Sequence, residues 1–185
     1  MSRWLASVLG AGSAAGGRPA LQRLHLPGAY GASGYTSVEL GIVLGAIGRS
    51  LLCAPFFSSV VLAANTLIPS GDESAKRAYL PGIASGETIA TLAITEPSGK
   101  WDESGITVAA TGSGTDWKLN GTKSFVIDGH IASLILVAAQ TDKGTPLFAV
   151  DSDADGLTRP PPPPVAPPPH HAEHHSHDPP RRRPP

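Results

Sequence analysis

The sequence predicts an α+β fold, in which N-terminal helices are followed by a partial antiparallel β-barrel or β-sandwich domain. Two patterns support this prediction. Between Thr36 and Tyr79, helix-capping signals precede stretches of apolar residues. From Thr88 onward, short strand-like runs are separated by glycine-containing turn signals. A chain with helices first and strands afterwards is typical of the α+β class.

The first helix is predicted to run from Thr36 to about Ile47. Thr36 and Glu39 have the spacing of a capping box, in which each side chain bonds the other residue's exposed backbone amide. The apolar residues expected on one face of this helix are Val38, Ile42, Val43, Ala46 and Ile47.

Two more helices are predicted before the strands. One follows Pro55 and stops at Pro69. The next runs from about Gly71 to Tyr79, with Ser70 and Glu73 as a second capping box. We expect this helix to end before Pro81, because the residue that precedes a proline avoids the helical region.

The second half of the chain contains runs with strand character. Within it, Asn120-Gly121 is the clearest local signal, because this dipeptide favours the two-residue turn of a β-hairpin. The predicted strands are Thr88–Thr95, Ile106–Ala110, Trp117–Leu119, Lys123–Ile127, Leu134–Ala139 and Leu147–Val150.

Composition divides the 185 residues into four segments. Residues 1–26 are a leader of uncertain structure, without Asp or Glu. Residues 27–86 form the helical segment and residues 87–159 the partial β domain. Residues 160–185 are a Pro/His/Arg tail that we expect to be disordered, since such a composition cannot form an apolar core. Its histidines are expected to bind metal only adventitiously, so we predict no metal site.

Charge and cysteine content exclude several classes of protein. The formal net charge of −1 and the lack of a basic stripe argue against nucleic-acid binding. Cys53 is the only cysteine, which excludes an intramolecular disulfide and favours a reducing compartment. No run reaches the roughly 20 apolar residues of a membrane span. We therefore expect a cytoplasmic protein. The acid-poor N-terminus leaves the mitochondrial matrix as the alternative.

An ordered series of motifs resembles the acyl-CoA dehydrogenase family. The match to its middle β domain consists of Thr95-Glu96-Pro97, Asp102, Gly105-Ile106 and Trp117-x-Leu119-Asn120-Gly121-x-Lys123-x-Phe125-Val126. The match to the end of its N-terminal helical domain consists of Tyr30-Gly31-x-x-Gly34 and Leu80-Pro81-x-Ile83-Ala84-x-Gly86-Glu87. Together these motifs extend from about Pro27 to Arg159.

The resemblance implies α,β-dehydrogenation of an acyl-CoA thioester with FAD as cofactor. It implies that Thr95 bonds the pyrimidine edge of the flavin and that Phe125 packs against the ring system. The backbone of Val126 and Ile127 would line the same wall. Trp101 stands where the family commonly has a serine that meets the acyl-CoA, and Ile127 stands where a threonine hydroxyl often reaches flavin N5.

The resemblance also implies partners and an incomplete site. In the family a C-terminal helical bundle, which we find no match for, supplies the catalytic glutamate, so no catalytic residue is predicted here. Implied partners are the acyl-CoA, an electron-transfer flavoprotein or similar acceptor, and other subunits of a homo- or hetero-oligomer. Alternatives are a non-catalytic subunit bound to a full-length acyl-CoA dehydrogenase, and a truncated gene product with out-of-register ends.

Overall fold

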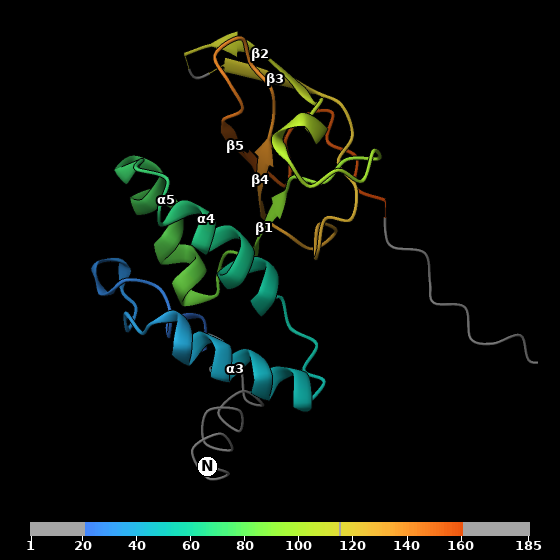
Figure 1. Ribbon diagram of the computed structural model, residues 1–185. Coiled ribbons are helices and arrows are strands. Elements are labelled where there is room, and N and C mark those ends of the chain that lie inside the picture. The colour runs from blue at the N-terminus through green and yellow to red at the C-terminus, as the bar shows by residue number, and fades with distance from the viewer. Residues whose placement is uncertain (1–20, 115, 161–185) are drawn as a thin grey trace, which may run out of the picture.

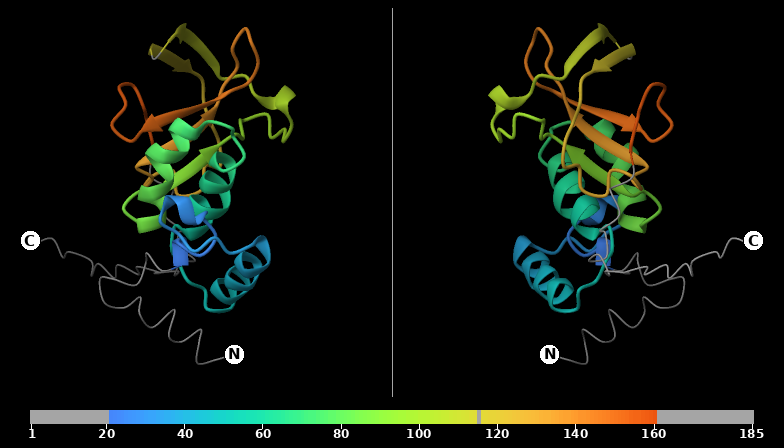
Figure 2. Two further views of the ribbon diagram at one scale, coloured as in Figure 1. Left: turned by 90° about the vertical axis from the view of Figure 1, so that its left-hand side faces the viewer. Right: turned by 90° about the vertical axis from the view of Figure 1, so that its right-hand side faces the viewer.

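A computed structural model describes residues 21–114 and 116–160. Helices form one side of the molecule and strands the other (Figure 1). The two side views of Figure 2 agree that the hairpin of β2 (Ala109–Ser113) and β3 (Asp116–Asn120) lies at the end opposite α3 (Ser37–Arg49). The predicted α+β class is confirmed. The predicted tail beyond residue 160 and most of the predicted leader lie outside the described residues.

Helix α3 begins as the sequence predicts. The Thr36 hydroxyl accepts a hydrogen bond from the Val38 amide at 3.2 Å, and the Thr36 amide donates to the Glu39 carboxylate at 2.9 Å. The predicted buried face is only partly right, because Val38 and Ile42 are exposed. The face that packs on the core is rotated around the helix and consists of Leu40, Val43, Leu44 and Ile47.

The segment after Pro55 is helical, but most of it is a π-helix. This element, η2 (Phe57–Ala64), continues into the short helix α4 (Asn65–Leu67). Val60 and Ala63 of η2 are fully buried, and the element lies against β1 (Ala90–Ala93). The apolar pattern of the sequence predicts a helix there and does not distinguish the wider π geometry.

Helix α5 (Glu73–Ser85) differs from the prediction at both ends. Asp72, not Ser70, is the N-cap residue, and its carboxylate accepts from the Ala75 amide at 2.9 Å. The helix also continues through Pro81 to Ser85, so the predicted end at Tyr79 is wrong. Leu80 and Ile83, on either side of the proline, are fully buried, and this burial outweighs the local cost of proline.

A three-stranded sheet has the order β1, β4 (Leu134–Ala138), β5 (Leu147–Asp151). Strand β4 is antiparallel to β5 but parallel to β1, so the prediction of purely antiparallel pairing is wrong at this point. Strands β2 and β3 form a separate antiparallel pair, and the described strands do not close into a barrel. Short 3₁₀ turns occur at Gly28–Tyr30 (η1) and Glu103–Gly105 (η3).

The predicted hairpin at Asn120-Gly121 is wrong. The β2–β3 turn lies instead next to Gly114, with Ser113 opposite Asp116, and Asn120 is the last residue of β3. Residues 123–127, predicted as a strand, are not in a regular strand, because Phe125 has a φ of 54°. A residue with positive φ cannot continue the extended backbone of a strand.

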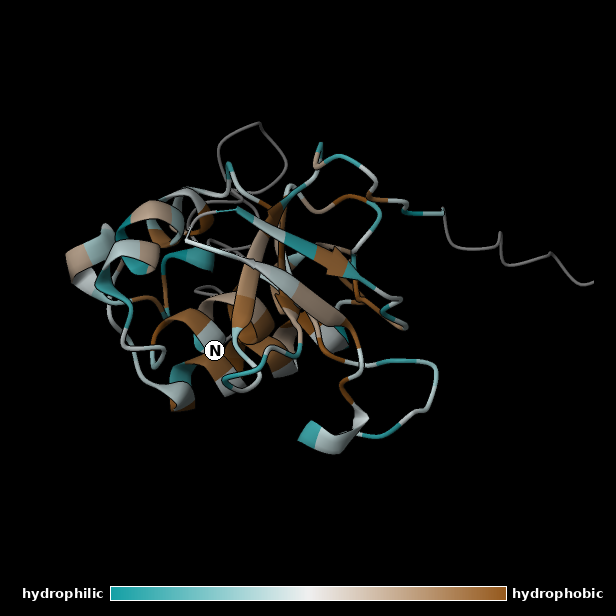
Figure 3. Ribbon diagram, turned by 90° about the horizontal axis from the view of Figure 1, so that it is seen from above, coloured by the Kyte–Doolittle hydropathy of each residue, from teal (hydrophilic) through white to brown (hydrophobic). Residues whose placement is uncertain are grey.

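The main core lies between the helices and one face of the sheet. Figure 3 shows hydrophobic residues concentrated on the central helices and strands, with hydrophilic ones mostly in the connections. Leu26, within the segment predicted as a leader, is fully buried in this core. Other fully or nearly fully buried members of the main core include Val60, Leu80, Ile83, Leu134 and Leu136. None of the helices in the described parts of the chain is long and apolar enough to cross a membrane.

Candidate functional site

Thr95 and Trp101 line one cleft of about 460 Å³ beside the end of β1. Thr95 lies two residues after the end of β1 and is half-buried, whereas Trp101 lies on the loop that follows and is 87% exposed. The remaining lining is partly apolar and partly charged, and includes Leu92, Ile106, Leu147, Lys100, Asp102 and Glu103. Such a mixture suits a ligand with apolar and polar parts.

The other predicted flavin residues lie beside this cleft rather than within its lining. The Ser124 amide donates to the Thr95 carbonyl at 2.8 Å, which places the segment that carries Phe125 next to the end of β1. Phe125 is 88% exposed, and the Ile127 side chain is also exposed. Val126 instead packs against a small apolar cluster between the loop and the sheet. The structure therefore brings the two predicted flavin segments together, and Trp101, but not Phe125, lines the cleft.

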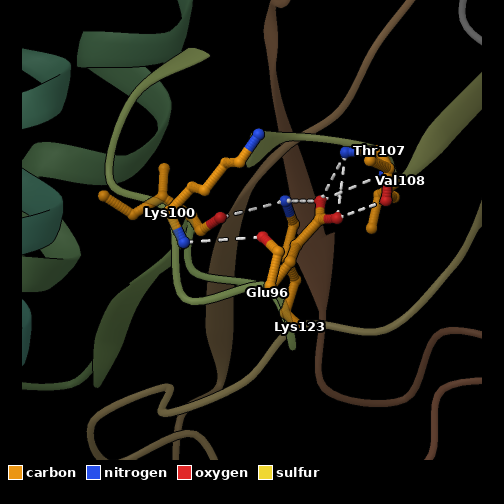
Figure 4. Close-up of polar contacts among 7 residues, drawn as sticks. Glu96, Lys100, Thr107, Val108 and Lys123 are labelled. Atoms are coloured by element: carbon orange, nitrogen blue, oxygen red, sulfur yellow. Dashed lines mark hydrogen bonds and ion pairs between the residues drawn. The ribbon is translucent and has the colours of Figure 1, made fainter. Parts of the chain in front are cut away.

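A buried carboxylate connects these segments (Figure 4). Glu96, next to Thr95, is only 3% exposed. The Lys123 ammonium donates to it at 2.7 Å, and the amides of Thr107 and Val108 donate at 2.9 and 3.0 Å. The Thr107 hydroxyl donates as well. Glu96 thus joins the end of β1, the approach to β2 and the start of the segment that carries Phe125.

The environment of Glu96 determines its protonation state. Burial by itself raises the pKa of the carboxyl, because it disfavours the charged form. The hydrogen bonds from Lys123, from the Thr107 hydroxyl and from the two backbone amides lower it by more, and the resulting pKa is about 2. Glu96 is therefore ionised at neutral pH and fully engaged by donors, which makes it a poor proton acceptor.

The sequence did not single out the roles of Glu96 and Lys123, although both belong to the quoted motifs. The sequence signal for their ion pair is their opposite charge: Glu96 follows a buried strand, and Lys123 follows Asn120-Gly121. A second pair had no sequence signal: the Ser58 hydroxyl on η2 donates to the Asp128 carboxylate at 2.6 Å across the fold.

A larger hollow of about 610 Å³ lies in the helical part, beside His25, Tyr35 and Asn65. None of the predicted site residues lines it. Among the described residues, no group of three or more His, Cys, Asp or Glu side chains is placed to hold a metal ion.

Two family models match the sequence. The model described as "Acyl-CoA dehydrogenase, N-terminal domain" matches residues 17–87, and "Acyl-CoA dehydrogenase, middle domain" matches residues 91–174. Acyl-CoA dehydrogenase FadE27 of Mycobacterium tuberculosis is 34% identical over 131 residues, which cover 71% of this chain and 34% of that protein. The chain thus spans about a third of the length of the curated relatives it matches.

Solved structures show the same similarity in three dimensions. A glutaryl-CoA dehydrogenase from Mycobacterium smegmatis in complex with FADH2 is 32% identical, with a TM-score of 0.67, over 75% of this chain and 36% of that one. The ChsE4–ChsE5 complex of M. tuberculosis is 28% identical, with a TM-score of 0.68, over 85% of this chain and 40% of that one. The chain therefore belongs to the acyl-CoA dehydrogenase family.

Proposed function

We propose that this chain forms part of the flavin and acyl-CoA site of an FAD-dependent acyl-CoA dehydrogenase, an oxidoreductase that acts on the α,β bond of an acyl-CoA thioester. The observation that carries the proposal is the 2.8 Å hydrogen bond between the Ser124 amide and the Thr95 carbonyl. This hydrogen bond holds side by side the two segments that surround the flavin in the family. The similar glutaryl-CoA dehydrogenase, solved with FADH2, supports the choice of cofactor.

The side chains fit a flavin in part. Phe125 presents an almost fully exposed aromatic ring, which can stack on a planar ring system. The Thr95 hydroxyl can both donate and accept at the pyrimidine edge, whereas the aliphatic Ile127 side chain offers no hydrogen bond. Bound FAD would supply the acceptor for a hydride from the β carbon. Trp101, at the neighbouring cleft, would form part of the wall against the acyl-CoA.

No proton acceptor is assigned within this chain. Glu96 is the carboxylate nearest Thr95 in sequence, but its pKa of about 2 and its donors leave it without a role in removing the α proton. The proposed partners are the acyl-CoA substrate, an electron-transfer flavoprotein or similar acceptor, and further family subunits. The proposed location is the cytoplasm, with the mitochondrial matrix as the alternative.

A second candidate function is that of a non-catalytic subunit that associates with a full-length acyl-CoA dehydrogenase. Two observations favour it. Ile127 replaces a hydroxyl with a group that cannot hydrogen-bond. In addition, one of the similar solved structures is a complex of two different chains, ChsE4 and ChsE5.

Flavin retention tests the first proposal. The purified chain is mixed with FAD, passed through gel filtration and examined by its visible absorption spectrum. We expect retained flavin absorbance, and we expect Thr95→Ala to weaken FAD binding by about tenfold, the equivalent of one lost hydrogen bond. Thr111→Ala, at an exposed position of β2, is the matched control and should bind as the parent does.

Absence of retained flavin would contradict a flavin site formed by this chain alone. The same preparation is then mixed with a full-length acyl-CoA dehydrogenase, and co-elution is measured. Co-elution would favour the subunit role, and separate elution would contradict that role as well.

A further inference from the structure

We propose that Ser58 and Asp128 are positioning residues, which hold residues 123–128 in a strained conformation that presents Phe125 to the flavin. The inference rests on the proposed function for what the segment presents. We call the Ser58–Asp128 hydrogen bond the brace. It can be tested without any flavin.

Backbone strain is concentrated in this segment. Among the described residues, three that are not glycine have positive φ: Leu51 at 48°, Phe125 at 54° and Asp128 at 56°. Two of the three therefore lie within four positions of each other. A left-handed conformation is tolerated by Asp but is unfavourable for a bulky residue such as Phe. The segment keeps this conformation only if its surroundings enforce it.

Individual contacts, not a strand ladder, supply that enforcement. At the start, the Lys123 ammonium bonds Glu96, and the Ser124 amide bonds the Thr95 carbonyl. Near the end, the buried Thr91 hydroxyl donates to the Ile127 carbonyl at 2.6 Å. The last contact is the Ser58–Asp128 hydrogen bond at 2.6 Å. The exposed Phe125 lies between these two sets of anchors.

The Ser58–Asp128 bond has the features of a strong anchor. Ser58 is fully buried, and its hydroxyl lies 2.6 Å from the Asp128 carboxylate and 3.2 Å from the Pro55 carbonyl. A serine hydroxyl has one proton to donate, and the charged, closer acceptor takes it. Ser58 lies on the π-helix η2, a rare geometry that is frequent at functional sites. The π-helix thereby connects the helical layer to the strained segment.

The adjacent serine provides a matched control. Ser59 is also fully buried on η2, but its hydroxyl lies 3.2 Å from the Ala90 carbonyl and 3.1 Å from the Ala90 amide, on strand β1. Ser58→Ala and Ser59→Ala therefore remove the same group from neighbouring buried positions. Only the first removes a contact to residues 123–128.

Hydrogen exchange of the flavin-free chain tests the brace. The amides of Gly129, Ile131 and Ala132 donate to carbonyls of Val126 and Asp128, so their protection reports the conformation of this segment. We expect Ser58→Ala to accelerate their exchange by about tenfold, which corresponds to the loss of a hydrogen bond to a charged group. Ser59→Ala should leave these amides unchanged. Equal acceleration in both variants, or none in Ser58→Ala, would overturn the proposal.

Substitution of the acceptor provides a rescue test. Asp128→Asn keeps an oxygen that accepts from Ser58 and tolerates positive φ, so the exchange of these amides should remain as in the parent. Asp128→Ala loses both properties and should exchange at least tenfold faster. If Asp128→Asn exchanges as fast as Asp128→Ala, the hydrogen bond does not hold the segment and the proposal fails.

FAD titration then separates the brace from the function. If the parent binds FAD, Ser58→Ala should weaken binding by about tenfold and change the visible circular dichroism of the bound flavin, whereas Ser59→Ala should do neither. Equal flavin binding by Ser58→Ala and the parent would contradict the positioning role. If the parent does not bind FAD, the proposed function of this chain alone fails, and the exchange results still decide for or against the brace.

Discussion

The Glu96 carboxylate is buried where three chain segments meet. Burial of a charge without partners is costly, and Glu96 avoids that cost through the Lys123 ammonium, the Thr107 hydroxyl and two backbone amides. Removal of either charged partner leaves the other charge buried, because the Lys123 side chain is only 9% exposed. The pair therefore matters more for holding the segments together than for chemistry.

The low pKa of Glu96 predicts a specific acid sensitivity. Because the folded-state pKa of about 2 lies below the ordinary value of 4.5, the ionised carboxylate stabilises the fold fully above about pH 5. That contribution, on the order of 3 kcal/mol, is lost as the pH falls from 4.5 through 2. Urea unfolding at each pH should show this fall in the parent and not in Glu96→Gln. At neutral pH, Glu96→Gln should be less stable by about 3 kcal/mol.

The control for this prediction is Glu87→Gln, at an exposed glutamate that follows α5. Its unfolding free energy should depend on pH as that of the parent does. A Glu96→Gln profile parallel to the parent profile would show that Glu96 does not provide the acid-sensitive stability.

Among the elements, those that depend on residues close together in the sequence were predictable. The Thr36–Glu39 capping box depends on side chains three positions apart, and it is present as predicted. Strand β4 is likewise an unbroken apolar run and lies at the centre of its sheet.

Other elements depend on contacts that the sequence does not display. Asn120-Gly121 carries a strong hairpin signal, but the antiparallel register of β2 and β3 places the turn at Gly114. Pro81 lies within α5 because burial of its neighbours outweighs its cost. At the candidate site, the motifs predicted that the segments of Thr95 and Phe125 lie side by side, and the hydrogen bond from the Ser124 amide to the Thr95 carbonyl joins these two segments. The hydrogen bonds of Glu96 and Ser58 span distant parts of the chain, and no spacing rule reveals them.

The N-cap of α5 gives a prediction at the scale of one element. Asp72→Ala removes the acceptor of the Ala75 amide and the negative charge at the helix start. We expect a loss of about 1 kcal/mol in the unfolding free energy, measured by urea denaturation. Asp153→Ala, at an exposed aspartate without a side-chain hydrogen bond among the described residues, removes the same charge and should change stability by less than about 0.5 kcal/mol. Equal losses would contradict the capping role.

Across the whole molecule, apolar side chains are exposed on both the helical and the strand sides. On the helical side they include Val38 and Ile42 of α3, and on the strand side Trp101, Phe125, Ile127 and Ile131. Exposed apolar groups that lie close together favour association with other protein surfaces. Both outer strands of the three-stranded sheet, β1 and β5, are edges as well.

Two adjacent positions of α3 test the contribution of this exposed surface. Ile42 is 56% exposed and Val43 is 5% exposed. We expect Ile42→Lys to reduce self-association in sedimentation experiments and to change the unfolding free energy by less than about 0.5 kcal/mol. Val43→Lys should unfold the helical layer, because it buries an unpaired charge. Unchanged association in Ile42→Lys, or a well-behaved monomer for the parent, would contradict a role for this surface in association.

The parallel pairing of β1 with β4 has a consequence for the order in which the chain folds. The two strands are connected by residues 94–133, and closing a loop of that length costs about 3 kcal/mol of chain entropy before the pairing compensates for it. Thr95, Trp101 and Phe125–Ile127 all lie within this loop. We therefore expect the candidate site to form late in folding, after the helices and the sheet have come together. A ligand of the site would then bind only the fully folded chain, and its presence would slow unfolding.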